Sequence, residues 1–395
     1  NEKQMLGILE EALENTEKLI CETKPDIIFG FVPVTLHEYL ILQLAEAKNI
    51  PVRLLRSTKI DNYISLNDSL FGLSNHIKVS IGKTDNTESR RVIDNYLTKT
   101  RSKGSIYEGM HLHDYSKRKF LLIRSIFKLL RSIFNEMKRI SDLDLYLDPH
   151  NPGYFIPTFI ENFLQPINAY KLRSLIDSSN KNFYSISKRR YCLFPLHFEP
   201  EIALQIYARP FQNQIELARN IALSLPPGMF LMVKEHPRSI GARSISYYKK
   251  LLEIPNVVLA PADSCSYDLV KSSTLVAVIT GNIGLEAAVL GKPVIVFGEP
   301  EYCELPSNMI KKCHNLYNLS KDINNLLLNY HLDENSLRAY LEAIVYNSVP
   351  IDLYSTLYRK EKRYAFSSMS YDDQLLLLKN YVLKRFTLKN ASKNE

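Results

Sequence analysis

The hydrophobic and polar positions of the chain alternate between two spacings. Apolar residues at helical spacing take turns with short apolar runs, which are typical of buried strands. The first elements predicted are a helix over residues 2–23, a strand over 27–32, a helix over 37–48 and a strand over 49–55. This order predicts a parallel pair with a right-handed crossover. Because the chain starts at Asn1 with a helix, we expect the natural chain to begin earlier and a first strand to precede this helix.

The pattern becomes more regular after residue 188. It predicts five strands, over residues 191–194, 229–233, 256–259, 275–279 and 292–297. The helices predicted between and after them cover residues 212–223, 247–252, 267–271, 284–290 and 319–330, and residues 337–386 are expected to be mostly helical. Strands that alternate with helices predict a doubly wound sheet. We therefore expect an α/β fold of two Rossmann-like domains, over residues 1–187 and 188–330, followed by C-terminal helices over 331–395.

One predicted helix, over residues 117–140, is apolar along one side and basic elsewhere. Its apolar stripe consists of Phe120, Ile123, Phe127, Leu130, Phe134 and Met137. The same stretch holds eight lysines and arginines and a single acidic residue, Glu136. A basic amphipathic helix can lie on an anionic membrane. It can equally pack on its own domain with its basic face in water, and the sequence leaves both possibilities open.

Composition narrows the class of protein and of partner. The 395 residues are 45% hydrophobic and 23% charged, which is a globular balance. The net charge of +8 favours an anionic partner, such as a nucleotide sugar, an anionic glycan or a membrane surface. The second domain lacks the interleaved aromatic and basic residues typical of nucleic-acid binding, so we expect no nucleic-acid partner. With five scattered cysteines, no signal peptide and no bilayer-length apolar run, a cytoplasmic location is predicted, with the inner-membrane surface as an open possibility.

Polar side chains follow the predicted strand over residues 229–233. Lys234, Glu235 and His236 come directly after it, and Pro237 follows. Ligands of open α/β sheets bind at the carboxyl ends of the strands. The proline holds His236 extended, because it disfavours the helical region for the residue before it. We therefore predict that Lys234, His236 and Pro237 belong to a ligand site.

The predicted strand over residues 275–279 ends in a turn of small residues. Thr280, Gly281, Asn282 and Gly284 lead into the helix over 284–290. A turn of this kind before a helix N-terminus favours an anion, and its glycines let a ligand approach the backbone. Glu286 lies about one turn into the helix, where a carboxylate can reach a ribose hydroxyl. Many doubly wound proteins have such a turn without a ligand, and this unit alone does not decide between the two.

Candidates for acid and base chemistry also lie at strand ends. His197 and Glu199 fall in the proline-rich loop over residues 195–201, after the strand over 191–194. Glu38 and Asp61 follow the first two predicted strands and are catalytic candidates by position only. An acidic residue in the first turn also favours the helix dipole, which explains Glu38 without catalysis.

Two short patterns raise the question of a metal. His111 and His113 alternate along the chain, and Asp142 and Asp144 flank Leu143. Alternate residues rarely suffice without a third and a fourth ligand nearby. Aspartates that alternate with leucines also fit a surface strand or helix edge. We therefore predict no metal site and no cofactor.

Several of these motifs together resemble the bacterial capsule polysaccharide biosynthesis family, which includes the retaining Kdo transferases of capsule and lipopolysaccharide assembly. The motifs that carry the resemblance lie at residues 194–201, 212–214, 234–237, 255–257, 280–287 and 291–298, in the family's order. The resemblance covers roughly residues 191–302. It implies a GT-B glycosyltransferase whose two Rossmann-like domains face each other, with the donor nucleotide on the C-terminal one and the acceptor near the N-terminal one.

The resemblance also implies roles for particular residues. His236 would contact the donor phosphate, as a His-Pro pair does in sialyltransferases that use CMP-sugars, and Glu286 with the 280–284 turn would hold the nucleotide. The final helices would cross back to the first domain, as is usual in GT-B enzymes. The family's turn usually has Thr or Ser where this chain has Asn282, which puts that position in doubt. No motif carries over the family's N-terminal catalytic carboxylate.

These implications lead to one expected function and several rivals. We expect a metal-independent glycosyltransferase that moves a sugar, Kdo or a related ulosonic acid, from a CMP-sugar to an anionic glycan or glycolipid. The rivals are a UDP-sugar transferase, a sugar-nucleotide 2-epimerase, a polyol-phosphate transferase that uses a CDP-alcohol, and a membrane-associated scaffold without nucleotide binding.

Overall fold

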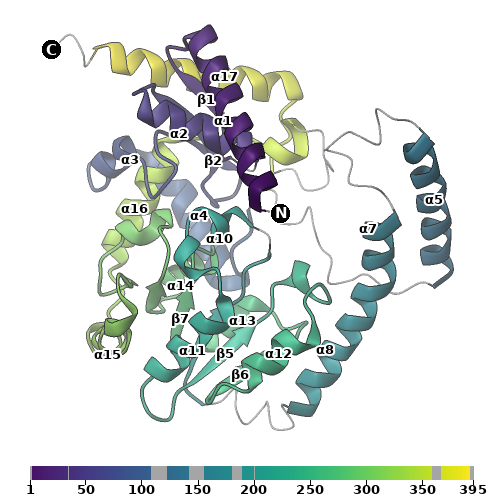
Figure 1. The fold of residues 1–395 in the computed structure, drawn as a ribbon. Helices are drawn as coiled ribbons and strands as arrows, with labels where there is room; N and C mark the ends of the chain where they lie inside the picture. Colours follow the sequence, from purple (N-terminus) through teal and green to yellow (C-terminus); the bar gives the residue numbers. More distant parts are fainter. Residues whose placement is uncertain are drawn as a thin grey trace.

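The structure is a computed structural model that describes residues 2–33, 35–107, 122–141, 155–179, 189–199, 201–357 and 366–391. It is an α/β protein with two sheets, as predicted. Figure 1 shows the first sheet and its helices at the top and the second sheet below. The histidines at 111 and 113 and the aspartates at 142 and 144, which were considered as metal ligands, lie outside the described residues.

The first sheet is mixed and has the strand order β1-β2-β3-β10. Its strands are β1 (Ile28–Phe31), β2 (Val52–Ser57), β3 (Tyr63–Asn67) and β10 (Ser348–Pro350). The predicted parallel pair is present, with β1 and β2 joined by α2 (Leu36–Ala47) and preceded by α1 (Glu2–Thr23). The other two pairs are antiparallel. In the described residues, the doubly wound pattern of this sheet is therefore limited to the β1–α2–β2 unit.

The C-terminal part of the chain returns to this first sheet. After β10 come η7 (Leu353–Leu357) and α17 (Tyr371–Ala391). The Tyr381 hydroxyl of α17 accepts the Leu66 N–H of β3 at 2.9 Å and donates to the Asn347 carbonyl at 2.6 Å. Buried Asp352 accepts hydrogen bonds from Asn62 Nδ2 and from the Phe366 and Ser367 N–H groups. These contacts fasten α17 to the sheet.

The second sheet has six parallel strands in the order β6-β5-β4-β7-β8-β9. They are β4 (Tyr191–Pro195), β5 (Phe230–Lys234), β6 (Val257–Leu259), β7 (Leu275–Val278), β8 (Val294–Val296) and β9 (Ile310–Lys312). The five predicted strands are confirmed, and β9 was missed because it is three residues long and ends in two lysines. The order is that of a Rossmann fold, with the chain winding outwards in both directions from β4.

Helices cover both faces of this sheet. The helical elements between residues 202 and 346 are α10 (Ile202–Gln205), η3 (Arg209–Phe211), α11 (Gln214–Ser224), η4 (Pro237–Ser239), α12 (Ile245–Leu252), α13 (Ser266–Ser272), α14 (Ile283–Val289), η5 (Glu301–Glu304), η6 (Leu316–Asn318), α15 (Leu319–Asn329) and α16 (Glu334–Tyr346). Alternate residues of β4 point to opposite faces: Tyr191 and Leu193 enter one core, and Cys192 and Phe194 enter the other. Because both faces are covered, the inner strands β4, β7 and β8 are apolar throughout.

One helix from the N-terminal half packs against the second sheet. The stretch over residues 72–114 carries no clear pattern, yet it forms α3 (Asn75–Ser80) and α4 (Thr87–Lys103). Apolar residues of α4 share a core with β7, α14 and α16. Arg101 of α4 also bonds Glu334 of α16 at 2.5 Å. The predicted domain boundaries stay predictions, but this helix belongs with the second sheet's core.

Four helical elements extend from the side of the second sheet. The predicted helix over 117–140 is α5 (Leu122–Ser141), which packs against α7 (Phe155–Phe159); η2 (Ile160–Leu164) and α8 (Gln165–Ser179) follow. Gly241 lets α8 approach, because it has a φ of +83° and a Cβ there would lie 2.1 Å from the Gln165 carbonyl oxygen. Figure 1 shows α5 set apart from both sheets. Among the described helices, none is long and apolar enough to cross a bilayer.

Candidate active site at the switch point of the second sheet

The candidate site lies where the winding direction of the second sheet reverses. β4 lies between β5 and β7 in the sheet. The chain passes from β4 to β5 on one side and from β7 to β8 on the other, so the loops after β4 and β7 start at neighbouring strands and lead in opposite directions. In open α/β sheets, ligands bind in the crevice outside this switch point. The loop after β4 carries His197, and the loop after β7 carries Thr280 and Gly281. The structure thus brings together residues that are more than 80 positions apart in the sequence.

His197 connects the two loops. Its Nε2 lies 3.4 Å from the Thr280 backbone nitrogen and accepts that N–H, so the ring proton is on Nδ1. Nδ1 lies 3.1 Å from a carboxylate oxygen of Glu201 and donates to it. The backbone of His197 is fixed as well, because Gln214 accepts its N–H at 2.7 Å and Arg243 donates to its carbonyl at 2.5 Å. The imidazole is therefore held in one orientation and one tautomer.

The two glutamates of the loop have different surroundings. Glu199 accepts a hydrogen bond from Gln214 and lies 3.3 Å from Arg243, whereas Glu201 is the partner of His197. Burial raises the pKa of Glu201, but the hydrogen bond from His197 and the electrostatic effects of His197, His236 and Arg238 together outweigh it and hold the pKa below the usual value. Glu201 is therefore ionised at neutral pH. The sequence motif contains it, but only the fold shows that it, and not Glu199, orients His197.

His236 is a neutral hydrogen-bond donor. Its Nδ1 accepts the Arg238 N–H at 3.1 Å, so the ring proton is on Nε2. Burial lowers the pKa of His236 to about 4, and nearby positive groups act in the same direction against the charge of Glu201. The ring centroid lies 6.2 Å from that of Phe198, and the Arg238 guanidinium lies 4.7 Å from the Phe198 centroid on the same loop pair. Pro237 is exposed and begins η4.

The residues on either side of His236 differ in what they can do. Lys234 is buried, its Nζ lies 3.5 Å from the Glu235 carbonyl, and burial lowers its pKa. The Glu235 carboxylate accepts from the His236 N–H at 2.5 Å, from Arg243 at 2.5 Å and from the Tyr248 hydroxyl at 2.6 Å. The hydrogen bonds that the Glu235 carboxylate accepts hold the loop in place. Glu235 therefore acts by positioning His236.

Some buried polar atoms around the crevice lack a partner. Among the described residues, Thr280 Oγ1, Arg238 Nε and Arg243 Nε are buried without a hydrogen bond. An unpaired buried polar atom costs free energy and calls for an explanation. Arg238 lies two residues after His236 in the chain, and Thr280 is the residue whose N–H bonds His197.

The turn after β7 is shaped by packing as well as by its polar groups. A Cβ at Gly284 would lie 2.3 Å from the Tyr302 hydroxyl oxygen, and that hydroxyl donates to the Gly281 carbonyl at 2.6 Å. Gly284 is therefore explained by Tyr302 alone. Asn282 precedes α14 without capping it, and its Nδ2 lies 3.1 Å from the Tyr107 hydroxyl, to which it donates.

Residues from the N-terminal half reach the same edge of the sheet. Tyr107 meets Asn282, and Lys59 lies 4.8 Å from the centre of the Tyr107 ring. Asp61 forms a backbone bridge with Tyr107, and its carboxylate pairs with Lys99 at 2.9 Å. Tyr107 was missed, because a single tyrosine in a polar stretch gives no signal. This side of the crevice is basic and aromatic.

Two further predicted residues lie in other settings. Glu286 accepts the Ser105 N–H at 3.3 Å, and burial raises its pKa. Its carboxylate thus faces the chain after α4. Glu38 forms a capping box with Thr35 at the start of α2, with contacts of 2.9 to 3.3 Å. Catalytic or binding roles for these two stay predictions, and the cap accounts for Glu38 by itself. The described residues contain no cluster of three potential metal ligands.

The strand order defines an α/β protein with a Rossmann-type sheet, whose polar loops lie at the switch point where such sheets bind ligands. Residues 159–304, from the end of α7 to η5, match the family described as "Capsule polysaccharide biosynthesis protein". This match confirms the resemblance seen in the sequence and contains both histidine loops and the turn after β7. No curated protein matches the chain.

Several solved structures match the chain at low identity and with TM-scores below 0.5. The Thermosulfurimonas dismutans KpsC β-Kdo 2,4-transferase is 14% identical with a TM-score of 0.44, over 82% of this chain and 80% of that one. The 2,7-transferase of the same organism is 12% identical with a TM-score of 0.38, over 86% and 82%. UDP-GlcNAc 2-epimerase from Neisseria meningitidis is 14% identical with a TM-score of 0.30, over 86% and 80%. The activities in these names are those of the named proteins.

Proposed function

We propose that the chain is a glycosyltransferase of bacterial surface polysaccharide biosynthesis, of capsule or lipopolysaccharide. The donor is a CMP-sugar, with Kdo or a related ulosonic acid as the sugar, and the acceptor is an anionic glycan or glycolipid at the inner-membrane surface. One observation carries the proposal. Within the segment that matches the capsule polysaccharide family, His197 and His236 follow the neighbouring strands β4 and β5, and Thr280, which bonds His197, follows β7 at the switch point of a Rossmann-type sheet.

The donor's phosphate would be bound mainly by neutral donors. His236 offers its Nε2–H, and Thr280 offers a hydroxyl that has no partner among the described residues. Gly281 and Asn282 allow the phosphate to approach the backbone, while Arg238 supplies positive charge nearby. Since the leaving nucleotide gains negative charge as the glycosidic bond breaks, donors fixed in advance stabilise that state more than the ground state. In this proposal Lys234, Pro237 and Glu286 complete the nucleotide site.

The anomeric carbon gains positive charge during the transfer, and carboxylates near it are favourable. Glu201 is ionised and orients His197, so the pair provides a negative group and a fixed imidazole beside the crevice. Glu199 flanks this pair. Asp61 and Tyr107 reach the crevice from the N-terminal half and form the acceptor side in this proposal. The positive roles fall to side chains and backbone groups, and no metal enters the scheme.

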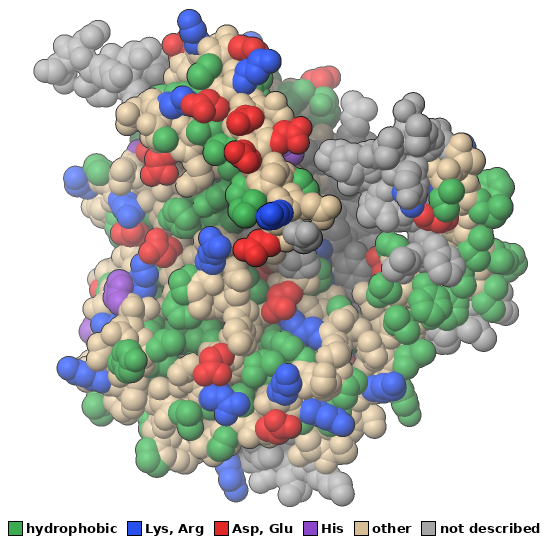
Figure 2. Space-filling view, in the orientation of Figure 1, with side chains coloured by type: hydrophobic (Ala, Val, Ile, Leu, Met, Phe, Trp, Pro, Cys, Tyr) green, Lys and Arg blue, Asp and Glu red, His purple; other side chains and the backbone are tan. Residues whose placement is uncertain are grey.

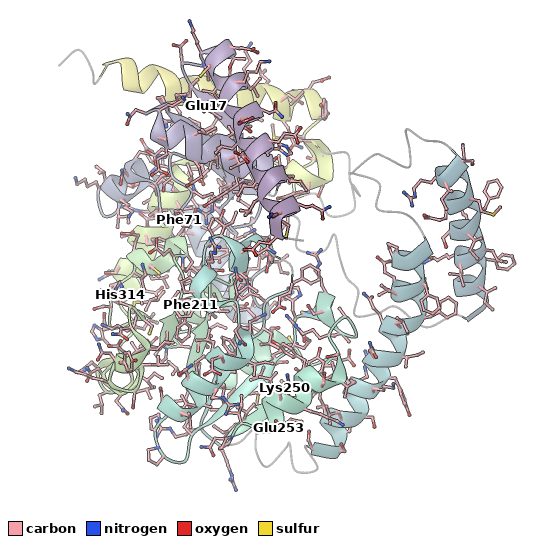
Figure 3. All side chains as sticks on the ribbon, in the orientation of Figure 1. Glu17, Phe71, Phe211, Lys250, Glu253 and His314 are labelled. Carbon is pink, nitrogen blue, oxygen red and sulfur yellow. The ribbon has the colours of Figure 1, made fainter. Side chains whose placement is uncertain are left out.

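Nucleotide selectivity tests the proposal. Binding of CMP, CDP, UDP and GDP would be measured by calorimetry for the wild type, His236→Ala and Thr280→Val. The matched control is His314→Ala, which removes an exposed histidine of the same half (Figure 3). We expect CMP to bind most tightly and to lose about tenfold or more in affinity in each crevice variant, the effect of one lost hydrogen bond to a charged group. His314→Ala should bind like the wild type.

The other outcomes separate the rivals. Preference for UDP would favour a UDP-sugar transferase or a 2-epimerase, and preference for CDP would favour a CDP-alcohol polyol-phosphate transferase. Absence of binding to all four nucleotides would overturn the nucleotide-sugar proposal. If His314→Ala weakened nucleotide binding as much as His236→Ala does, the crevice would not be the nucleotide site.

A further inference from the structure

Helix α5 carries an apolar face that is exposed among the residues the structure describes. Seven large apolar residues of α5 are exposed: Ile126, Phe127, Leu130, Ile133, Phe134, Met137 and Ile140. Phe127, Phe134 and Met137 are each exposed by more than 65%. The spacing of the seven residues puts them on one side of the helix. Figure 2 shows hydrophobic side chains gathered over α5 and α7, and Figure 3 shows side chains of α5 projecting away from both sheets.

The contact between α5 and the protein uses a different side of the helix. Ser132 is buried, and Lys128 donates to Asn162 of η2 at 3.3 Å. Glu136 pairs with Arg139 and is half-buried. The helix is therefore held by a small and polar face, while its apolar face stays in water. An apolar face of this size on a folded protein indicates a binding surface.

Charge indicates what binds there. Arg131 and Lys138 are exposed and follow Phe127 and Phe134 by four residues each, so they border the apolar face directly. The helix has five basic residues and one acidic residue, and that acid is paired with Arg139. An apolar face edged by basic side chains complements a bilayer with anionic headgroups, where the apolar groups enter the acyl boundary and the cations stay at the surface.

We infer that α5 lies in the surface of an anionic membrane and holds the protein there without crossing it. This extends the proposed place of the reaction to a defined surface. The inference about α5 rests on the proposed function only for which membrane is bound, the inner membrane. The vesicle experiment below contains neither donor nor acceptor, so its failure would leave the nucleotide experiment unaffected, and the reverse also holds.

The experiment measures binding of the full chain to sedimenting vesicles. One set contains 30% phosphatidylglycerol in phosphatidylcholine and the other phosphatidylcholine alone. We expect the wild type to bind the anionic vesicles at least about tenfold more tightly, with affinity falling as salt is raised. Phe127→Glu with Phe134→Glu should reduce this binding at least about tenfold, because two apolar anchors are lost and two negative charges gained.

Two matched controls keep the result specific. Leu223→Glu with Leu328→Glu makes the same change at exposed leucines of α11 and α15 and should bind like the wild type. Arg131→Glu with Lys138→Glu should weaken binding to anionic vesicles, whereas Lys249→Glu with Lys250→Glu on α12 should have a much smaller effect. Circular dichroism shows whether each variant is folded.

Other outcomes would overturn the inference. Absence of vesicle binding by the wild type, or equal binding by the α5 and α11/α15 variants, contradicts it. If Phe127→Glu with Phe134→Glu instead abolishes a concentration-dependent dimer in sedimentation, and no vesicles bind, the apolar face joins two copies of the chain.

Discussion

Gly284 provides the sharpest test of how the turn after β7 is built. Replacing it with alanine places a Cβ 2.3 Å from the Tyr302 hydroxyl oxygen and 2.7 Å from its Cζ. Tyr302 is almost fully buried and bonds the Gly281 carbonyl, so the ring cannot move without breaking that contact. If Gly284 is a glycine because of Tyr302, the substitution should destabilise the fold whether or not a ligand is present.

The magnitude follows from three terms. Overpacking of a filled core costs about 1–3 kcal/mol, and loss of the Tyr302–Gly281 hydrogen bond costs about 1 kcal/mol more. Alanine is favoured over glycine in a helix by about 0.5–1 kcal/mol, which offsets part of the cost. We expect Gly284→Ala to lower the free energy of unfolding by about 2–3 kcal/mol. Tyr302→Phe, which loses only the hydrogen bond, should cost about 1 kcal/mol.

The assay is urea unfolding of a double-mutant cycle. In a Tyr302→Leu background the clash is absent, so Gly284→Ala should cost less than about 0.5 kcal/mol there, and the coupling should be about 2 kcal/mol. Nucleotide affinity is measured on the same proteins. A Gly284→Ala variant with unchanged stability but lost nucleotide affinity would refute the packing argument and show that the glycine serves the ligand.

Two further predictions concern charge. Burial lowers the pKa of His236 from 6.5 to about 4, so the unfolded chain takes up a proton first as the pH falls, and stability that is present above pH 6.5 is lost towards pH 4. Between pH 7 and 5 the wild type should lose up to about 2 kcal/mol more than His236→Gln in urea unfolding; equal losses would contradict this. Asp352→Ala should cost about 3 kcal/mol or more, because it leaves buried donors of Asn62 and the chain before α17 unpaired, and amide exchange at Phe366 and Ser367 should rise. The exposed Asp372→Ala is the control, and equal exchange in both variants would refute the role of Asp352.

The elements of the second sheet could be predicted because their signal is local. β4, β5 and β7 are buried on both faces, so each is a continuous apolar run, and each run is followed by a turn. Strands β3 and β10 could not be predicted in the same way. β3 follows a polar loop, and β10 is a three-residue strand that pairs with a strand nearly 300 residues earlier. Their strand character comes from that pairing, which local pattern does not contain.

The candidate site shows the same division. Position at the carboxyl end of a strand is a local property. Two residues chosen on that ground, His197 and Thr280, lie next to each other in the structure. The partners of the side chains are not local. Nothing in the sequence indicates that Glu201 orients His197 while Glu199 meets Gln214, or that Tyr107 arrives from the N-terminal half. Asp61 and Glu38 were chosen by position alone, and the structure adds an ion pair for the first and a helix cap for the second, so their catalytic roles stay predictions.

The two histidine loops behave as one unit because Arg243 links them. Its guanidinium contacts the Glu235 carboxylate beside His236, the His197 carbonyl and the Glu199 carboxylate. One buried cation thus sets the distance between the loops after β4 and β5. Glu235 also accepts hydrogen bonds from the His236 N–H and the Tyr248 hydroxyl, so its carboxylate serves to hold these loops in place. The charged groups that hold the loops are therefore distinct from the uncharged groups beside them. The charges that hold the loops are paired with one another, so in the proposed donor site a phosphate would meet a neutral imidazole, a hydroxyl and backbone groups, and it would bind without first breaking an ion pair.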